Sequence, residues 1–178
     1  MDIEKTVSSQ LIFEGKVIKL RIDTVVMPNG RETQREIIVH RGAVAIVAVD
    51  NDDNLLLVRQ FRKPAEKVLL EIPAGTLDPG EGPDATALRE LQEETGYFPE
   101  KMERLGGFYS APGFCTEFIY LYLATELVPR RLHAEDTDEI ELVRVPVAKA
   151  RELISSGAVC DAKSVAGLLL YLDYRHNL

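Results

Sequence analysis

The stretch GTLDPGEGPDATALRELQEETGY, residues 75–97, contains the turn and helix signals around which the rest of the chain is interpreted. Pro83 suits the first turn of a helix, and Gly96 suits its end because glycine adopts the left-handed conformation at little cost. The spacing predicts a helix whose core of regular turns runs from Ala85 to Thr95. Its expected packing face is made of Ala85, Leu88, Leu91 and Thr95.

The same helix concentrates negative charge. Glu90 and Glu94 lie one turn apart, Glu93 lies beside them, and Glu81 precedes the helix. Like charges at this spacing destabilise a helix by about 0.3 kcal/mol per pair. A divalent cation would remove that conflict, because Mg²⁺ binds carboxylate oxygens. Arg89 can pair with Glu93 at i,i+4 and hold the cluster together. The alternative is an acidic face exposed to solvent.

The spacing of the fixed residues favours the metal site. Gly75 is followed after five residues by Glu81, and after seven more by the run RELQEETGY, residues 89–97. This pattern resembles the Nudix box, G-x5-E-x7-R-E-U-x-E-E-x-G-U, in which U is a bulky apolar residue. Every specified position matches, with Tyr97 a mild departure at the last one.

The resemblance implies a reaction and a metal site. The reaction is hydrolysis of a nucleoside diphosphate linked to another group. The cofactor is Mg²⁺, or Mn²⁺ or another divalent cation, bound by Glu90 and Glu94, with Glu93 also a candidate. The backbone carbonyl of Ala74, just before the box, is implied as a further ligand. Such a cation offsets the charge of a pyrophosphate and lowers the pKa of an attacking water.

Residues after the box favour one branch of the family. Pro112 follows Gly96 by sixteen residues, and Glu117 follows it in the segment GFCTE. This spacing resembles that of the Nudix ADP-ribose pyrophosphatases, in which the acidic residue lies near the terminal ribose. Taken alone, Pro112–Gly113 is also an ordinary tight turn.

Three arginines are candidate substrate ligands. The resemblance implies that Arg62 contacts the substrate's phosphates, which suits the forked guanidinium. Arg59 is a second candidate, with a surface ion pair as the alternative. Arg35 resembles the residue that reaches into the partner's site in these enzymes. The chain departs from related enzymes at Lys16 and Val17, where an aromatic residue often stacks on adenine.

A second acidic cluster is AEDTDEIE, residues 134–141. Its composition also fits an exposed loop. In the ADP-ribose branch the corresponding loop supplies a carboxylate that acts as general base or orients water. Asp138 aligns best with that residue, and Glu135, Asp136 and Glu139 are within reach of the same role. Glu93 of the box is the other candidate base.

The remaining sequence predicts strands and two C-terminal helices. Strands are expected at 11–18, 20–27 and 33–39, with a hairpin turn at Pro28–Gly30. Further strands are expected at 43–50, 55–61, 68–75, 105–109, 118–124 and 140–146, and helices at 147–155 and 162–175. The predicted fold class is α/β (α+β), a Nudix-type α/β/α sandwich with a mixed sheet plus a small N-terminal antiparallel sheet. Residues 1–40 are expected to form a dimerisation element, and residues 41–178 the Nudix hydrolase domain.

Composition limits the possible binding partners and the cellular location of the protein. The chain of 178 residues carries 29 acidic and 21 basic side chains, a net charge of −8, which argues against nucleic-acid binding. No apolar run approaches the roughly eighteen residues of a membrane helix. Cys115 and Cys160 lack metal-site spacing, and the N-terminus does not resemble a signal peptide, so free thiols and a cytoplasmic location are expected.

Three functions are compared. The first is a homodimeric enzyme that hydrolyses ADP-ribose to AMP and ribose 5-phosphate. The second keeps the chemistry but acts on another nucleoside diphosphate sugar, such as GDP-mannose. The third is a non-catalytic Nudix module that senses ADP-ribose. The third is disfavoured because all four box glutamates are present.

Overall fold

The structure, a computed structural model, describes residues 3–134 and 139–177. It divides into two compact units. The first comprises Met1–Gly42 and Tyr109–Phe118, and the second comprises Ala43–Phe108 and Ile119–Leu178. None of the helices in the described ranges has the length and apolar character needed to cross a membrane.

The first unit is built on a three-stranded antiparallel sheet in the order β1-β2-β3. Its strands are β1 (Lys5–Glu14), β2 (Ile18–Val26) and β3 (Glu32–His40). The hairpin predicted at Pro28–Gly30 is confirmed, because Gly30 takes a left-handed φ of 81° between β2 and β3. The strand predicted at residues 11–18 is wrong. β1 begins and ends earlier, since the chain turns at Gly15, whose N–H donates to the carbonyl of Ile18 at 2.9 Å.

The second unit contains a mixed sheet in the order β10-β5-β4-β9-β8, in which β6 also pairs with β5 and β7 with β4. β4 runs antiparallel to β5 and parallel to β9. The strands are β4 (Ala43–Val49), β5 (Asn54–Arg62), β6 (Lys67–Glu71), β7 (Ala74–Thr76), β8 (Tyr97–Tyr109), β9 (Phe118–Pro129) and β10 (Glu141–Pro146). The helices are α1 (Pro83–Thr95), α2 (Ala150–Ser155) and α3 (Ala162–His176), with short 3₁₀ turns η1 (Lys63–Ala65) and η3 (Val147–Lys149).

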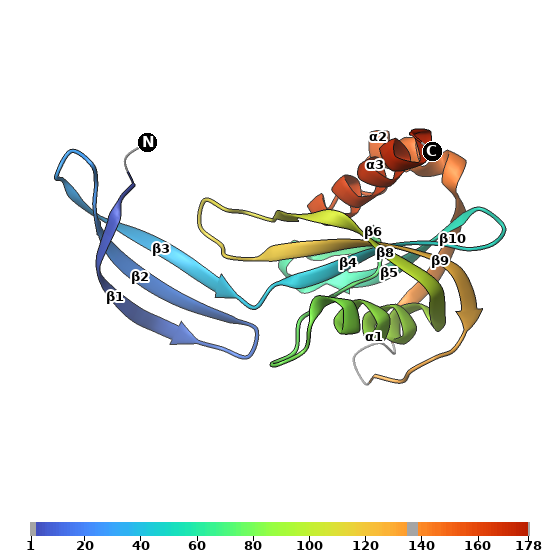
Figure 1. Cartoon of the computed structure of the whole chain (residues 1–178), viewed down its shortest axis with the longest axis horizontal. Helices are drawn as coiled ribbons and strands as arrows, with labels where there is room; N and C mark the ends of the chain where they lie inside the picture. The colour runs from blue at the N-terminus through green and yellow to red at the C-terminus, as the bar shows by residue number, and fades with distance from the viewer. Residues whose placement is uncertain (1–2, 135–138, 178) are drawn as a thin grey trace. The chain divides into compact units, whose positions relative to one another are not determined.

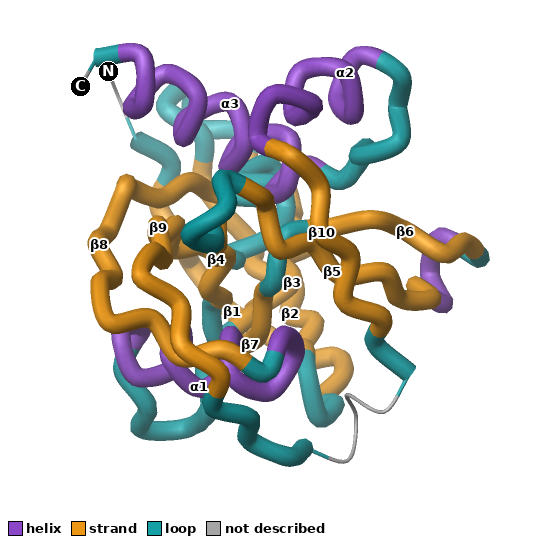
Figure 2. Tube along the Cα trace, turned by 90° about the vertical axis from the view of Figure 1, so that its right-hand side faces the viewer, coloured by secondary structure: helices purple, strands orange, loops and turns teal. Residues whose placement is uncertain are grey.

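The sheet of this unit is covered on both faces, as the predicted sandwich requires. Helix α1 lies on one face, and α2 and α3 lie on the other (Figures 1 and 2). Every residue of β4 is buried. Its side chains alternate, so that Ile46 packs in a core with Leu91 of α1, whereas Val47 packs in a core with Leu168 of α3. The fold class is therefore the predicted mixed α/β arrangement.

Two local predictions need correction. The strand predicted at residues 68–75 is two strands, β6 and β7, separated at Ile72–Pro73. Proline has no N–H for a sheet hydrogen bond, so the ladder is interrupted there. On α1, Ala85 is exposed and Leu88 only half-buried, whereas Ala87 is fully buried. The helical period was predicted correctly, and Leu91 and Thr95 of the predicted face are buried, but the buried face also includes Ala87 and Glu94 in place of Ala85.

Candidate functional site

Helix α1 presents the box residues and is fixed at both ends. Pro83 occupies its first turn, and the C-terminal Gly96 takes a left-handed φ of 81°, with its N–H donating to Gln92. Near the N-terminus, the hydroxyl of Tyr122 on β9 donates to Asp84 at 2.5 Å. Burial, together with this bond to a carboxylate, raises the pKa of Tyr122. Because both ends are anchored, the carboxylates between them have defined positions.

Arg89 lies at the centre of three box carboxylates. Its Nε and Nη2 donate to Glu81 at 3.2 and 2.9 Å. Its Nη1 donates to Glu90 and to Glu93, each at 2.9 Å. The hydrogen bond with Glu81 is the largest cause of the raised pKa of Arg89, and it likewise lowers the pKa of Glu81. The predicted pairing of Arg89 with Glu93 is present, and Arg89 offsets repulsion among all three glutamates.

The Glu90 carboxylate lies against the backbone of Gly75. An ideal Cβ on Gly75 would lie 1.9 Å from the carboxyl carbon of Glu90, which is shorter than any real contact. The glycine at the start of the box therefore creates the space that this carboxylate fills. The Glu90 side chain retains only 14% exposure.

Glu94 contacts the residue just before that glycine. Its Oε2 accepts a hydrogen bond from the N–H of Ala74 at 3.0 Å. Burial raises the pKa of Glu94 to about 8, and the charge of Glu90 adds to the shift, whereas the Ala74 N–H opposes it. A buried carboxylate whose negative charge is this unfavourable is suited to bind a cation.

These oxygens fit a hard divalent cation. Glu90 lies against Gly75 and Glu94 accepts from the N–H of Ala74, so both carboxylates lie beside the Ala74–Gly75 backbone. Within the described ranges, no three His, Cys, Asp or Glu side chains form a ready-made metal group. Glu90 and Glu93 are instead paired with Arg89. Two carboxylates with a backbone carbonyl, completed by water and phosphate oxygens, form the kind of open site that Mg²⁺ uses.

Arg62, predicted to contact phosphates, pairs with a buried acid. Its Nε and Nη2 donate to the two oxygens of Glu71 at 2.8 and 2.7 Å. Glu71 is 1% exposed, and Lys163 of α3 also contacts it. Burial would raise the pKa of Glu71, but the Arg62 hydrogen bond and the Lys163 charge outweigh it, so this pKa is lowered. The bond to Glu71 in turn raises the pKa of Arg62.

The other candidates of this unit are less constrained. Arg59 forms an exposed ion pair with Glu141 across β5 and β10 at 2.8 Å, which was the alternative interpretation of this residue. Glu139 is exposed in a turn before β10. The candidates Glu135, Asp136 and Asp138 lie outside the described residues.

The first unit contains the candidates Arg35, Pro112, Gly113 and Glu117. Arg35 on β3 donates from Nη2 to Glu4 at 2.8 Å. Pro112–Gly113 form a turn, with the N–H of Phe114 donating to Ala111 at 3.2 Å. Glu117 lies 3.5 Å from Nδ1 of His40.

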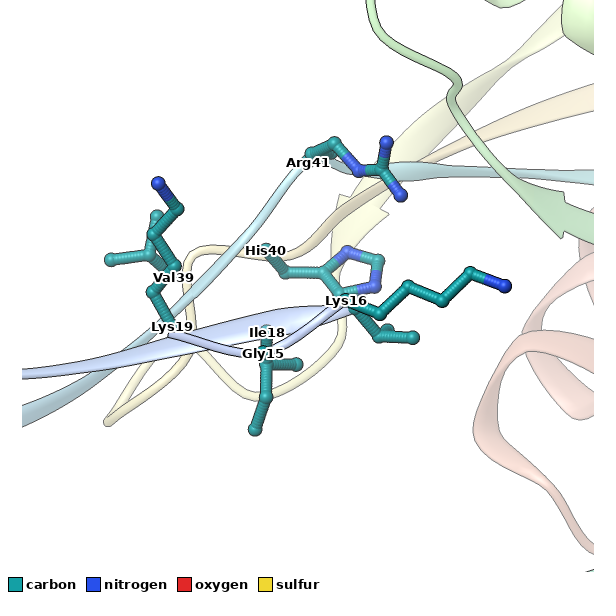
Figure 3. Close-up of a pocket in the computed structure, with 8 residues that line it drawn as sticks. Gly15, Lys16, Ile18, Lys19, Val39, His40 and Arg41 are labelled. Atoms are coloured by element: carbon teal, nitrogen blue, oxygen red, sulfur yellow. The ribbon is translucent and has the colours of Figure 1, made fainter. Parts of the chain in front are cut away.

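The end of the β1–β2 hairpin borders a basic pocket of about 360 Å³ (Figure 3). Its lining residues are Gly15, Lys16, Val17, Ile18, Lys19, Val39, His40 and Arg41. Lys19 is paired with Glu14, whereas Lys16 and Arg41 extend away from the hairpin. The pocket contains no aromatic ring other than the imidazole of His40, so a base bound here would meet cationic and aliphatic groups.

Comparison with known proteins finds matches over nearly the whole chain. The family model described as NUDIX domain matches residues 39–166, and the model described as nucleoside diphosphate sugar hydrolase N-terminal domain matches residues 4–38. An ADP-ribose pyrophosphatase of Bacillus subtilis (strain 168) is 42% identical over 177 residues, covering 98% of this chain and 95% of the relative. A methanol dehydrogenase activator of Bacillus methanolicus is 46% identical over the same coverage.

A solved structure described as an ADP compounds hydrolase superimposes with a TM-score of 0.90, covering 99% of this chain and 96% of that one at 24% identity. At that identity the likeness concerns the fold. The chain belongs to the Nudix family and is a Nudix hydrolase. Nudix hydrolases generally use a divalent cation, and the sugar-nucleotide relatives imply a small-molecule substrate.

Sequence reasoning missed the Glu71–Lys163 pair. Glu71 was interpreted only as part of an apolar strand, VLLEIPAG, and Lys163 as part of a C-terminal helix. The available signal was the single acid in that strand, since a buried carboxylate requires a cationic partner. The partner lies 92 residues away along the chain, so no local spacing identifies it.

Proposed function

We propose that the protein hydrolyses the pyrophosphate bond of ADP-ribose to AMP and ribose 5-phosphate. The observation that carries this proposal is the placement of Glu90 and Glu94 against the Ala74–Gly75 backbone, beside the cations Arg62 and Arg89. The choice of substrate is supported by the ADP-ribose pyrophosphatase of B. subtilis, which matches nearly the full chain.

In this proposal one Mg²⁺ would be held by Glu90, Glu94 and the Ala74 carbonyl, with Glu93 available to a further cation. When bound, the ion offsets the pyrophosphate charge and acidifies the attacking water. Arg89 holds Glu90 and Glu93 in fixed positions through its hydrogen bonds to them. Arg62 binds a phosphate oxygen with the N–H groups that Glu71 does not use.

The chemical step is a displacement at one of the two phosphorus atoms. A water oxygen forms a new bond to phosphorus, and the bond from that phosphorus to the bridging oxygen breaks. A carboxylate accepts the water's proton, either Glu93 or one of the loop residues Glu135, Asp136, Asp138 and Glu139. Pro112, Gly113 and Glu117 contact the terminal ribose, and Arg59 contributes positive charge to the substrate's approach.

A second candidate substrate is another nucleoside diphosphate sugar, such as GDP-mannose. The observation that favours it is the hairpin pocket, in which Lys16 and Val17 occur where related ADP-ribose enzymes often have an aromatic residue. A cationic and aliphatic lining selects weakly among bases, because stacking on a ring is absent.

We also propose that residues 1–40 form a dimerisation element joined to a hydrolase domain at residues 41–178. Every residue of β1 is exposed, including Val7 at 60%, Leu11 at 54% and Phe13 at 55%. An apolar edge strand of this length is a ready surface for pairing with another chain. In the dimer, Arg35 contributes to the partner's site.

Cys115 and Cys160 are free thiols, which supports a location in the reducing cytoplasm.

A substrate panel in ¹⁸O-labelled water tests the proposal. ADP-ribose, GDP-mannose and ADP-glucose are each incubated with Mg²⁺ or Mn²⁺, and products are resolved by chromatography and mass spectrometry. ADP-ribose is expected to be cleaved fastest, with the label in one product revealing which phosphorus is attacked. Stimulation of a methanol dehydrogenase is measured in parallel, because one relative is named for it. Stimulation without cleavage of any sugar nucleotide contradicts the proposal.

A further inference from the structure

Among the described residues, the guanidinium of Arg62 is hydrogen-bonded along one edge, by Glu71. Nε and one N–H of Nη2 are used by Glu71, at 2.8 and 2.7 Å. Arginine carries five N–H donors, so three remain for another ligand. The Arg62 side chain is 38% exposed, so part of it is open to a ligand. Glu71 thus orients a guanidinium that can still bind an oxyanion.

Glu71 itself depends on a second cation. Its side chain is 1% exposed, and its Oε2 contacts both Arg62 and Lys163. Lys163 is 15% exposed and is held in turn by Asp161, at 2.8 Å. The result is an alternating chain of four charges that runs from the start of α3 to Arg62. Loss of one member leaves its neighbour buried with an unbalanced charge.

The first turns of α3 also fix the backbone beside Glu71. The N–H of Ile72 donates to the hydroxyl of Ser164 at 2.9 Å, and this bond is buried. At Gly167 an added Cβ would lie 2.8 Å from Ile72, so the helix lies close against this segment. Ile72 precedes Ala74 by two residues. The segment that leads into the carboxylate site is therefore held by α3.

We propose that Lys163 is a positioning residue for the substrate's phosphates, acting through Glu71 on Arg62. The inference rests on the proposed function, in which Arg62 binds a phosphate oxygen of the diphosphate. Lys163 keeps the Glu71 carboxylate in one orientation, and that carboxylate aligns the guanidinium. A mobile Arg62 would still carry its charge but would bind the phosphate less often in the correct geometry.

A purely structural role for Lys163 predicts a different pattern of kinetics. A structural role lowers the amount of folded protein and affects turnover whatever residue occupies position 71. A positioning role raises KM for the diphosphate, because Arg62 contacts it in the ground state, and leaves kcat nearly unchanged. The effect of Lys163 on KM also disappears once the residue at position 71 no longer carries the charge that binds Arg62.

The test is a double-mutant cycle of Lys163→Met and Glu71→Gln. Each single variant is expected to raise KM about tenfold, with kcat changed by less than about threefold. The double variant is expected to match Glu71→Gln alone, about tenfold and not about a hundredfold. Lys163→Arg is expected to restore a KM near that of the unmodified chain. Lys149→Met removes an exposed lysine paired with Glu152 and serves as the matched control.

Additive effects in the cycle overturn the inference, as does an unchanged KM in Lys163→Met or a fall in kcat alone. If Lys163→Met does not fold, Glu71→Gln is compared with the double variant, in which neither buried charge remains. The substrate is whichever sugar nucleotide the unmodified chain cleaves fastest. Slow cleavage of ADP-ribose then counts against the proposed function alone, and no cleavage of any sugar nucleotide overturns both.

Discussion

The carboxylate of Glu90 fills the space that a side chain on Gly75 would need, with 1.9 Å between its carboxyl carbon and an ideal Cβ at that glycine. Gly75 does not have the left-handed φ found at Gly30 and Gly96. Its role is therefore to permit close approach, and any larger residue must displace Glu90.

Replacement of Gly75 by alanine is expected to lower kcat by on the order of a hundredfold, because the displaced Glu90 carboxylate cannot keep its position in the site. The free energy of unfolding should fall by about 1–3 kcal/mol, as for other overpacked positions. Kinetics and urea unfolding measure the two effects. Gly82→Ala is the control, since an added Cβ there meets nothing within 4 Å. Equal activity of both variants would contradict the steric argument.

Glu94 predicts a pH-dependent stability in metal-free protein. Its pKa is raised from 4.5 to about 8 by burial, so the folded state favours the protonated form. The resulting stabilisation is complete below pH 4.5 and is lost as pH rises toward 8. At about 1.4 kcal/mol per pKa unit, the loss is on the order of 3 to 5 kcal/mol.

Urea unfolding in chelator across this pH range measures that slope. Glu94→Gln is expected to flatten it, because the amide does not titrate. Addition of Mg²⁺ at pH 8 is expected to raise the free energy of unfolding of the unmodified chain but not that of this variant. A slope that survives in Glu94→Gln would assign the effect to other groups.

The exposed strand β1 predicts a self-association surface. Leu11→Asp replaces one of the exposed apolar side chains of β1 with a carboxylate and is expected to convert dimers to monomers. These monomers should have little activity, because in the proposal the partner supplies Arg35. Deletion of residues 1–40 is expected to give inactive monomers or aggregates. Light scattering coupled to size-exclusion chromatography measures the mass. The control is Gln10→Asp, the exposed neighbour on the opposite face of the strand. A stable, active monomer of the unmodified chain would rule out this assembly.

The acidic segment at residues 134–141 is expected to supply a general base. Asp138→Asn is expected to lower kcat by roughly a hundredfold with KM and metal affinity unchanged. Asp136→Asn and Glu139→Gln identify the residue if Asp138 is replaceable. Combined replacement of Glu135, Asp136, Asp138 and Glu139 tests whether this segment or Glu93 supplies the general base. Full activity of the combined variant would show that the segment is not needed and would leave Glu93 as the group that accepts the proton of the attacking water.

Local patterns predicted the elements better than their partners. The alternation and turn residues correctly located β2, β3 and the hairpin between them, and the box predicted α1 and the grouping of Arg89 with Glu93. The orientation of α1 was not predictable in the same way. The spacing of apolar residues reveals the helical period, but the rotation of the helix depends on contacts such as that between Glu94 and Ala74.

The charge network shows a second limit of sequence reasoning. Arg62 was predicted to contact the substrate's phosphates, but its network with Glu71 and Lys163 was not predicted, since the Glu71–Lys163 pair joins β6 to a helix near the C-terminus. Burial of Glu71 is decided by the sheet and by α3 together. Such long-range partners follow from topology, which a motif at fixed local spacing does not encode.

The most direct test of the central claim is the turnover of ADP-ribose by Glu90→Gln and Glu94→Gln with Mg²⁺ present. Each variant is expected to lose on the order of a thousandfold in kcat while remaining folded, because transition-state charge loses its main stabiliser. Glu100→Gln, an exposed acid beyond α1, is expected to retain full activity. Near-normal turnover by either Glu90→Gln or Glu94→Gln would contradict the placement of the catalytic site on α1.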